Sequence, residues 1–385
     1  MSAAAAITGL GLHLCGPSDV PDAARMAIEV VGQACREAGI DIADLDGLLV
    51  NRNELIADDH LSLDLARTGG FGRLRALYEL ESKGTTFAVL VEQAVRLVEA
   101  GRARHVAVVF ADAAIVPGRP AGAAFASMGG DEGYRGLERA NGMLGAVAAY
   151  ALLADSFFAE RGGSADDLYA VASTQRQWAS LNPLARARSP LAREEYLESP
   201  LVATPLRRLD CARPVSGAAA VVVSRPRGDA SVPPVHLCGS AQRYAARRRH
   251  APGSTWRPDG AKDAFDEARD QAGWSTADLD LVQIYDPFTV VPLILLEELG
   301  LVDQGKAGAW YADGNAGPGG ALPVNTGGGQ ISGFYLQGVT PVVEAVTQLR
   351  GTAGDRQVDG ARRAAVVAIG GRLEGHATLC LGTDS

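Results

Sequence analysis

The chain has 385 residues and a formal net charge of −9, from 36 basic and 45 acidic side chains. This acidic balance argues against a general nucleic-acid surface, which needs an excess of Lys and Arg. Hydrophobic residues make up 47% of the chain and charged residues 21%, so the chain can bury a core larger than that of one ordinary α/β domain.

The five cysteines are scattered, and none forms a CxxC pair or a His/Cys cluster. An odd, dispersed count is typical of reduced, buried thiols in a cytosolic protein. The first residues lack the basic segment of a signal peptide. No apolar run approaches the roughly 20 residues that a membrane-spanning helix needs. We therefore expect a cytoplasmic protein without a membrane segment.

The first predicted unit is an amphipathic helix followed by a buried strand. Apolar residues recur at helical spacing through Ala24–Cys35, and Gly39 stands where a helix C-cap is expected. The apolar run Leu48–Val50 then suits a buried strand. A second helix at Ala88–Glu99 leads to a second strand at His105–Phe110. This alternation predicts parallel strands covered by helices.

A region of different composition follows. It contains the Gly-rich stretch MGGDEGYRG, a predicted long helix over Leu144–Arg161, and the sequence NPLARARSP. We interpret residues 113–205 as an inserted loop domain on the first half. A buried strand is predicted to end at Ser224, and the Pro- and Gly-containing residues 225–234 are predicted to link the two halves.

The order of the first unit recurs in the second half. Residues 38–46 read AGIDIADLD and residues 272–280 read AGWSTADLD, which match at six of nine positions. The second copy also follows an amphipathic helix and precedes an apolar run, Leu281–Ile284. The helix Val342–Leu349 and the strand Ala364–Ile369 repeat the second pair. We therefore predict two duplicated α/β halves, residues 1–230 and 231–385.

Three segments carry a resemblance to a known family. They are PLRRLDCARPVSGAAAVVV (Pro205–Val223), YDPFTVVPLILLEELG (Tyr285–Gly300), and the stretch from LPVNTGGGQISGFYLQG to the end of the following helix (Leu322–Gly351). In these segments the sequence resembles the thiolase superfamily, specifically its sterol-carrier-protein-like branch. The resemblance covers nearly the whole chain. It implies a thiolase-like fold whose two halves pack in an α-β-α-β-α arrangement.

The cysteine nucleophile of a thiolase is missing. Its position falls at about Gly84, and no cysteine lies between Cys35 and Cys211. A helix N-terminus that would lower a thiol pKa has no thiol to act on. The histidine of the thiolase GHP motif would fall in residues 332–335, which contain none. Covalent Claisen condensation is therefore not expected, and an acyltransferase with an unusual nucleophile is the weakest alternative.

A subgroup of this branch also lacks the cysteine. The sequence is similar to the lipid-transfer-protein aldolases of bacterial steroid side-chain degradation, whose Tyr-Asp before Phe-Thr and second tyrosine match Tyr285 and Tyr335. The resemblance implies that these tyrosines form an acid/base pair. The implied reaction is retro-aldol cleavage of a bulky, steroid-like β-hydroxyacyl-CoA to a ketone and a shorter acyl-CoA. Coenzyme A enters as part of the substrate, and no cofactor is expected.

Such a cleavage needs groups that hold the enolate oxygen and orient the tyrosines. Gly327, Gly328 and Gly329 could present backbone N–H groups to the thioester oxygen, because glycine lets a ligand approach the main chain. Asn325 resembles an asparagine that supports the site in this fold, and an Asn-Thr-Gly turn explains it equally well. Asp286 either orients a tyrosine or caps a helix beginning near Phe288, and we favour the cap.

The sequence also departs from the aldolase pattern. Family members commonly carry histidine where this chain has Pro287 and Gln337, and aspartate where it has Ser216. Loss of both histidines favours a second hypothesis, a non-catalytic thiolase-like subunit that supports a partner enzyme. The resemblance implies a homodimer with a small zinc-ribbon and OB-fold partner protein.

Two basic runs are candidates for binding the phosphates of coenzyme A. They contain Arg186 and Arg188 in LARARSP, and Arg247 and Arg248 in RRRH. Guanidinium geometry suits bidentate phosphate binding, although a solvated surface accounts for such runs more often. The histidines near predicted strands, His105, His236 and His376, have no partners at metal-ligand spacing, so no metal site is predicted.

Overall fold

The computed structural model describes residues 4–16, 19–52, 61–115, 133–228, 232–244 and 260–384. The elements of the first half are β1 (Ala6–Leu14), α1 (Ala23–Glu37), the 3-10 turn η1 (Ile42–Asp44), β2 (Gly47–Asn51), α2 (Leu61–Thr68), β3 (Ala76–Leu80), α3 (Thr86–Glu99), β4 (His105–Asp112) and β7 (Gly217–Ser224). Between β4 and β7 lie α5 (Gly133–Ala140), α6 (Gly145–Arg161), α7 (Ala165–Ser180), α8 (Arg193–Glu198), β5 (Leu201–Ala203), β6 (Leu206–Arg207) and the 3-10 turn η2 (Arg208–Asp210).

The second half begins at β8. Its elements are β8 (Val235–Tyr244), α9 (Ala261–Ala272), the 3-10 turn η3 (Thr276–Asp278), β9 (Leu281–Ile284), α10 (Val290–Glu298), α11 (Ala307–Ala312), the π-helical turn η4 (Gly329–Gly333), α12 (Val339–Leu349), the 3-10 turn η5 (Gly354–Arg356), β10 (Arg363–Gly370) and β11 (Gly375–Gly382). The repeated motif therefore links helix, 3-10 turn and strand in both halves, as α1-η1-β2 and α9-η3-β9.

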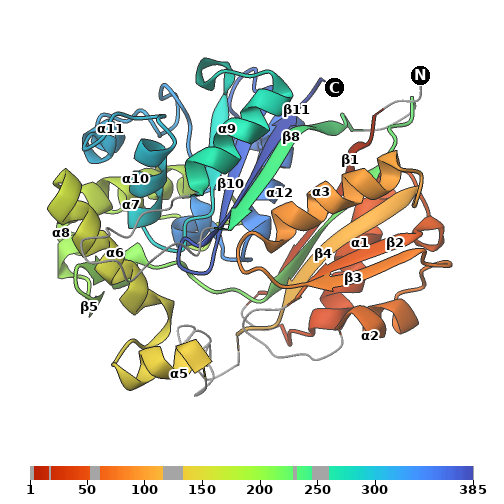
Figure 1. Cartoon of the computed structure of the whole chain (residues 1–385), viewed down its shortest axis with the longest axis horizontal. Coiled ribbons are helices and arrows are strands. Elements are labelled where there is room, and N and C mark those ends of the chain that lie inside the picture. The colour runs from red at the N-terminus through yellow and green to blue at the C-terminus, as the bar shows by residue number, and fades with distance from the viewer. Residues whose placement is uncertain are drawn as a thin grey trace.

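Both halves arrange their strands in the same order. The nine main strands run β3-β2-β4-β7-β1-β8-β11-β10-β9 (Figure 1). β2 and β4 are parallel, and β7 and β1 follow antiparallel, just as β9 and β10 are parallel and β11 and β8 follow antiparallel. In the place of β3, the second half has a single bridge between Val282 and Val324. The predicted duplication is thus present in the sheet.

Glycines in the first strand of each half let a helix approach closely. A Cβ added at Gly9 of β1 would lie 1.9 Å from the carbonyl oxygen of Ala34 in α1. A Cβ at Gly239 of β8 would lie 2.0 Å from the carbonyl oxygen of Ala268 in α9. A side chain at either position would push helix and strand apart. In both halves, therefore, a glycine in the first strand allows close packing of the covering helix.

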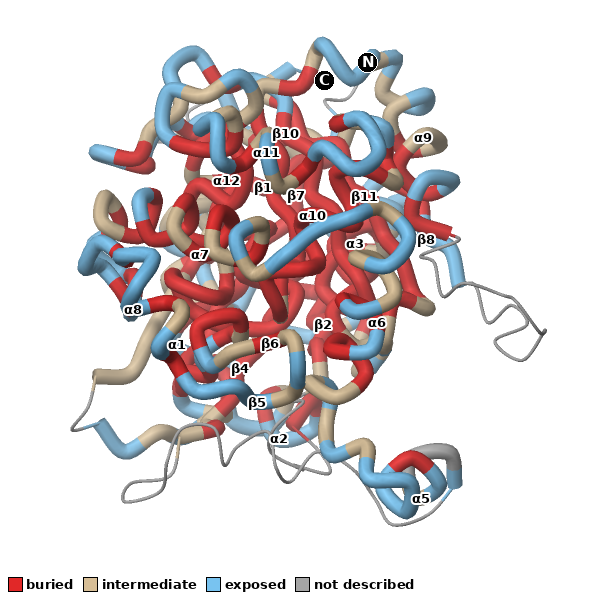
Figure 2. The backbone as a smooth tube through the Cα atoms, turned by 90° about the vertical axis from the view of Figure 1, so that its left-hand side faces the viewer, coloured by how far each residue is buried: buried red, intermediate tan, exposed pale blue. Residues whose placement is uncertain are grey.

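The core has the expected layers. One apolar cluster joins α1 to the outer face of β2, β4 and β7, and a second encloses α3 and α12 between the strands of the two halves. α9 covers β8 and β11, while α6, α7 and α10 pack over β9 and β10. This α-β-α-β-α order confirms the predicted thiolase-like architecture, and Figure 2 shows the buried residues concentrated along its centre.

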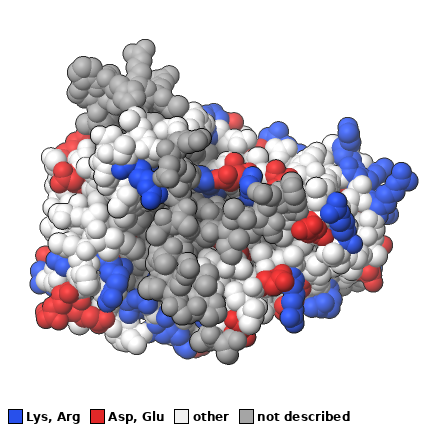
Figure 3. All heavy atoms as spheres, turned by 90° about the horizontal axis from the view of Figure 1, so that it is seen from below, with Lys and Arg blue, Asp and Glu red and all other residues white. Residues whose placement is uncertain are grey.

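The described part of the inserted region is helical, with α5 to α8 and the β5-β6 ribbon. The boundaries at residues 113, 205 and 230 remain predictions. Among the described residues, no helix combines the length and apolarity needed to cross a membrane. On the face shown in Figure 3, described basic and acidic side chains are interspersed, in keeping with the mixed composition.

Candidate active site

The two tyrosines singled out from the sequence follow two different segments of the second half. Tyr285 comes directly after β9, and its backbone N–H donates to the carbonyl of Val367 at 2.9 Å. Tyr335 follows the turn η4, and its N–H donates to the carbonyl of Arg213 at 3.2 Å. These backbone hydrogen bonds to neighbouring segments therefore fix the main-chain positions of both tyrosines.

The side chains of Tyr285 and Tyr335 meet. Their hydroxyl oxygens are 3.1 Å apart, a hydrogen bond in which either can donate. The rings stand edge to face, with centroids 6.4 Å apart and planes inclined by 63°. Tyr285 is 6% and Tyr335 5% exposed, so the pair is almost removed from water. A proton can pass between two hydroxyls at this separation.

The Tyr285 ring lies where a side chain at position 84 would be. A Cβ added to Gly84 would lie 2.8 Å from two ring carbons of Tyr285, including the one that carries the hydroxyl, and 2.3 Å from the carbonyl oxygen of Ile369. Gly84 therefore provides the space that the ring occupies. The position at which the family resemblance places the missing nucleophile is filled from the opposite half of the molecule.

Asp286 is not a helix cap, and that interpretation was wrong. α10 begins four residues later with Thr289 as its N-cap, and Asp286 is fully buried and turned to the Gly-rich segment. Its carboxylate accepts the backbone N–H of Gln330 at 2.9 Å and the side-chain amide of Gln175. Burial raises the pKa of Asp286 to about 7, although these hydrogen bonds act in the opposite direction.

The Gly-rich turn is packed too tightly for side chains. A Cβ at Gly329 would lie 2.2 Å from the Asp286 carboxylate, and one at Gly328 would lie 2.7 Å from Ala179. The N–H of Gly328 donates to the carbonyl of Asn325 at 2.8 Å, so it serves the turn itself. Asn325 has a φ of 53°, and its Oδ1 accepts the N–H of Ile284 at 2.6 Å. Asn325 therefore ties the turn to the end of β9.

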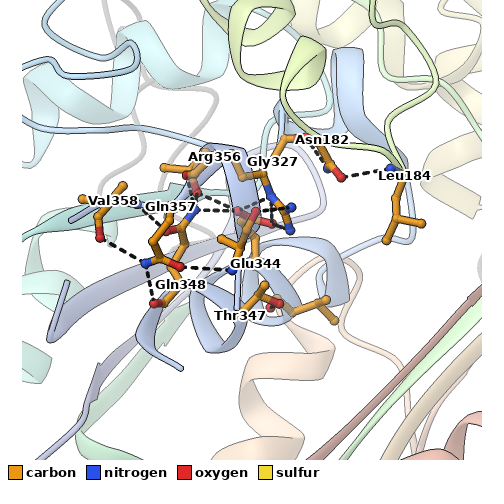
Figure 4. Close-up of polar contacts among 12 residues, drawn as sticks. Asn182, Leu184, Gly327, Glu344, Thr347, Gln348, Arg356, Gln357 and Val358 are labelled. Carbon is orange, nitrogen blue, oxygen red and sulfur yellow. Dashed lines mark hydrogen bonds and ion pairs between the residues drawn. The ribbon is translucent and has the colours of Figure 1, made fainter. Parts of the chain in front are cut away.

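A buried polar network holds this turn from behind (Figure 4). Asn182 of the inserted region donates to the carbonyl of Gly327 at 2.9 Å. Thr326 donates to Glu344 at 2.8 Å, and Glu344 is paired with Arg356 at 3.0 Å. Gln348 donates to the same Glu344 oxygen at 3.0 Å. The network satisfies a buried carboxylate and leaves the turn a defined conformation.

Comparisons with known proteins bear on the family of this chain. A family model described as "Thiolase C-terminal domain-like" matches residues 245–383. A protein named 17-hydroxy-3-oxo-4-pregnene-20-carboxyl-CoA lyase, from Mycobacterium tuberculosis (strain ATCC 25618 / H37Rv), is 31% identical over 92% of this chain and 93% of its own. A steroid side-chain-cleaving aldolase from Thermomonospora curvata is also 31% identical, over 92% of this chain and 93% of its own.

The chain belongs to the thiolase superfamily, in the branch of the steroid side-chain-cleaving aldolases. A solved structure described as the Ltp2-ChsH2(DUF35) aldolase superposes with a TM-score of 0.87 at 27% identity, covering 99% of this chain and 98% of that one. The family and the fold inferred from the sequence are thereby confirmed.

Where family members commonly carry a histidine, Gln337 makes a contact between the two halves. Asn51, at the end of β2, donates to Gln337 Oε1 at 2.8 Å. Gln330 in turn donates to the carbonyl of Gln337 at 2.8 Å. Gln337 has a φ of 51°, so its conformation is one that few side chains adopt. Gln337 is therefore part of a hydrogen-bonded chain of amides that also contains Asn51 and Gln330.

The arginines predicted to clamp coenzyme A are only partly accounted for. Arg247 and Arg248 lie outside the described residues. Arg186 donates to the carbonyl of Cys15 at 2.7 Å, and Arg188 donates to the carbonyl of Ser180 at 3.2 Å. Both arginines are exposed, and the Arg186 hydrogen bond joins the inserted region to the segment just after β1. These hydrogen bonds to carbonyls neither establish nor oppose a phosphate role, so that role stays a prediction.

Thiol and metal chemistry receive little support from the described side chains. The backbone of Cys211 forms an isolated antiparallel β-bridge with that of Phe288 beside the site. Burial raises the pKa of the Cys211 thiol to about 12. His13, Cys15 and Asp19 have ligand atoms within 4.8 Å of one another. Each of these groups has a further protein partner: His13 contacts Glu29 at 3.2 Å, Cys15 contacts Met26 Sδ at 3.3 Å, and Asp19 accepts the N–H of Gly16 at 2.6 Å. The expectation of no metal site remains a prediction.

Proposed function

We propose that the protein is an aldolase-type carbon–carbon lyase that cleaves a bulky, steroid-like β-hydroxyacyl-CoA. The observation that carries this proposal is the 3.1 Å contact between the hydroxyls of Tyr285 and Tyr335 in a buried site. The names of two relatives, a carboxyl-CoA lyase of a steroid and a steroid side-chain-cleaving aldolase, support the same reaction class.

The tyrosine pair suits the proton transfers of a retro-aldol step. One tyrosine, as phenolate, removes the proton of the β-hydroxyl group. The bond between Cα and Cβ breaks, Cβ becomes the carbonyl carbon of a ketone, and the bonding electrons form the enolate of the thioester. The other tyrosine donates its proton to Cα, which completes the shorter acyl-CoA. Transfer of a proton across the hydroxyl contact then restores the first state.

The helix that begins beside Tyr285 favours negative charge there. Gly84 precedes Thr85, the N-cap of α3, and it faces the ring carbon that bears the Tyr285 hydroxyl. The N-terminus of a helix carries a partial positive charge, equivalent to about half an elementary charge. We assign Asn325, Gly327, Gly328, Gly329 and Asp286 to positioning, because they hold the turn that leads to Tyr335.

Tyrosine-to-phenylalanine variants test the proposal. Tyr285→Phe and Tyr335→Phe remove one hydroxyl each and keep the ring, so the fold is preserved. We expect each to lower turnover of a β-hydroxyacyl-CoA by about 10²–10⁴-fold, the usual contribution of general acid–base catalysis. Tyr169→Phe is the matched control, because its hydroxyl makes an ordinary hydrogen bond to the carbonyl of Leu191 at 3.2 Å. Its turnover should match wild type.

A different result would favour the second hypothesis. Wild-type turnover in both variants would remove the acid/base role, and no cleavage by the wild-type chain with any partner would leave a non-catalytic thiolase-like subunit. The specific observation behind that alternative is the replacement of the family histidine by Gln337, which is committed to Asn51. Replacing Gln337 by His should change the rate only if the site is catalytic.

We also propose that the chain forms a homodimer in the cytoplasm and works with a small zinc-ribbon and OB-fold partner. The similar solved structure is named as a complex of two components, which supports the partner. Light scattering of the purified chain at micromolar concentration should give twice the mass of one chain. A stable monomer would contradict the dimer. Turnover should be measured with the co-expressed partner, because an isolated subunit can lack activity for reasons unrelated to the site.

A further inference from the structure

A buried arginine without a carboxylate partner lies next to the turn that leads to Tyr335. Arg176 of α7 is 7% exposed. Its guanidinium donates to Ser332 Oγ at 3.3 Å and to the carbonyl of Ser189 at 3.0 Å. Within the described residues it forms no ion pair. A cation removed from water without an opposite charge is costly, so such an arginine calls for an anionic neighbour.

The nearest charges include more cations. Burial lowers the pKa of Arg176, and the positive charge of Arg213 lowers it further. The pKa of Arg213 is itself lowered by burial and by the charge of Arg208. Neither Arg208 nor Arg213 forms an ion pair with a described carboxylate, and both residues reach the surface. Among the described residues, Glu195 is the acidic group that acts on Arg176 and Arg213, from beyond ion-pair distance.

Arg176 and Arg213 border the segment that carries Tyr335, and Arg208, at the end of the same loop, is close enough for its charge to act on Arg213. The backbone N–H of Arg213 donates to the carbonyl of Gln330 at 3.2 Å, and its carbonyl accepts the N–H of Tyr335 at 3.2 Å. Arg176 contacts Ser332 in the same stretch. One guanidinium is therefore anchored under residues 330–335, and another belongs to the strand-like segment that pairs with them. An anion bound here would lie beside the segment that carries Tyr335.

We propose that Arg176, Arg208 and Arg213 bind the phosphate groups of the coenzyme A portion of the substrate. This inference rests on the proposed function, which supplies the acyl-CoA. Guanidinium groups match phosphate oxygens in geometry and charge, and three of them suit a ligand with a pyrophosphate and a third phosphate. The exposed guanidinium groups of Arg208 and Arg213 contact the phosphate oxygens, and the buried Arg176 supplies a fixed positive charge beneath these two arginines.

Binding of free coenzyme A to the full chain tests the site without requiring turnover. We expect Arg208→Ala and Arg213→Ala each to raise the Kd for coenzyme A by roughly 10-fold, as for loss of one charge-assisted hydrogen bond. The same variants should bind pantetheine, which has no phosphate, as wild type does. Arg176→Lys, which keeps the charge but not the fork, should weaken coenzyme A binding without the loss of folding that Arg176→Ala risks.

Control variants distinguish these three arginines from the other basic side chains of the surface. Arg193→Ala removes an exposed arginine of the same inserted region that is already paired with Asp166 at 2.7 Å, and it should leave the Kd unchanged. Arg186→Ala and Arg188→Ala measure the contribution of the clamp predicted from the sequence. An unchanged Kd in both Arg208→Ala and Arg213→Ala overturns the proposal, as does an equal loss of pantetheine binding.

The proposed function and this site fail in different ways. If wild type binds coenzyme A and the arginine variants bind it equally well, the phosphate site is wrong and the lyase proposal stands. If wild type binds neither coenzyme A nor acyl-CoA, both are wrong. Tyr285→Phe should retain wild-type coenzyme A affinity, because its hydroxyl lies at the reacting end of the substrate.

Discussion

At the carboxyl end of β2 stands Asn51, and at the matching end of β9 stands Tyr285. The repeated motif fixes this correspondence, because residues 46 and 280 end its two copies. Lys83 and Gln337 also resemble each other in backbone conformation: each has a positive φ, of 59° and 51°, and each precedes a glycine at the start of a helix. The two halves therefore share their backbone geometry and carry different side chains at equivalent positions.

The two halves therefore contribute different groups to the site. The second half supplies both tyrosines and the carboxylate of Asp286, while the first half supplies space at Gly84 and an amide at Asn51. A duplicated fold gives two equivalent strand ends beside one another, and only one needs to carry reactive groups. The other can be shaped to fit them. This asymmetry can be tested by changing one side at a time.

Among the variants that test this asymmetry, the largest effect is expected from Gly84→Ala. The added methyl group would meet the Tyr285 ring at 2.8 Å and the Ile369 carbonyl at 2.3 Å, so the ring must move. Displacement of a catalytic group by about 1 Å costs on the order of 100-fold in rate. Turnover and melting temperature should both fall. Gly32→Ala in α1 is the control, where alanine should stabilise the helix by roughly 0.5–1 kcal/mol. Unchanged turnover in Gly84→Ala would show that the ring does not need this space.

A second comparison concerns ion pairs on the two equivalent helices. Arg356 pairs with Glu344 of α12, and both side chains are 9% exposed. Arg356→Ala would leave a buried carboxylate without its partner, and we expect a loss of about 3–5 kcal/mol in the free energy of unfolding. In α3, Arg96 pairs with Glu92; the arginine side chain is 66% exposed and the glutamate side chain 7%. Arg96→Ala should cost less, about 1 kcal/mol, because removal of an exposed guanidinium lets water reach the Glu92 carboxylate. Denaturant unfolding of both variants measures the difference.

Asp286 should make stability depend on pH in the direction opposite to an ordinary paired carboxylate. Its folded pKa, about 7, lies above the unfolded value of 3.8. The folded protein therefore holds a proton that the unfolded chain releases, and the stabilisation present below pH 4 is lost as pH rises towards 7. The slope is at most about 1.4 kcal/mol per pH unit. Unfolding of Asp286→Asn between pH 4 and 7 should lack this slope. An identical pH profile in wild type and variant would contradict the assignment.

The smallest effect is expected from Tyr311→Phe. The Tyr311 hydroxyl is buried and has no hydrogen-bond partner among the described residues. Its removal should leave stability within about 0.5 kcal/mol of wild type or raise it, because no hydrogen bond is lost. Tyr196→Phe is the contrast, since that hydroxyl donates to Asp210 at 2.9 Å. A loss of roughly 1.5–3 kcal/mol is expected there. A comparable loss in Tyr311→Phe would reveal a partner for its hydroxyl.

The local sequence pattern was sufficient to predict the main helices and strands of the two halves. Helical spacing and the repeated nine residues identified α1, α9, β2 and β9, because each of these elements is specified by residues close in sequence. The tyrosines were found through the family resemblance, since nothing in the spacing of Tyr285 and Tyr335 indicates that their hydroxyls meet. Fifty residues separate them.

What remained out of reach depends on contacts between distant segments. Asp286 was interpreted as a cap because the local sequence shows a helix after it, whereas its partners are Gln175 and Gln330. Arg176 and Arg213 gave no signal because neither belongs to a basic run. The packing of the Tyr285 ring on Gly84 joins the two halves of the molecule, and no single segment records it.

That packing also sets the order in which mutations can occur. In this backbone, a side chain at position 84 and the Tyr285 ring compete for one volume, so a chain carrying both would have to distort β10 or turn the ring away. An ancestor with a nucleophilic side chain at this position could not gain the tyrosine in its present place first. The path to this site runs through the loss of that side chain, and a return to covalent chemistry would need the tyrosine to leave before a nucleophile could be restored.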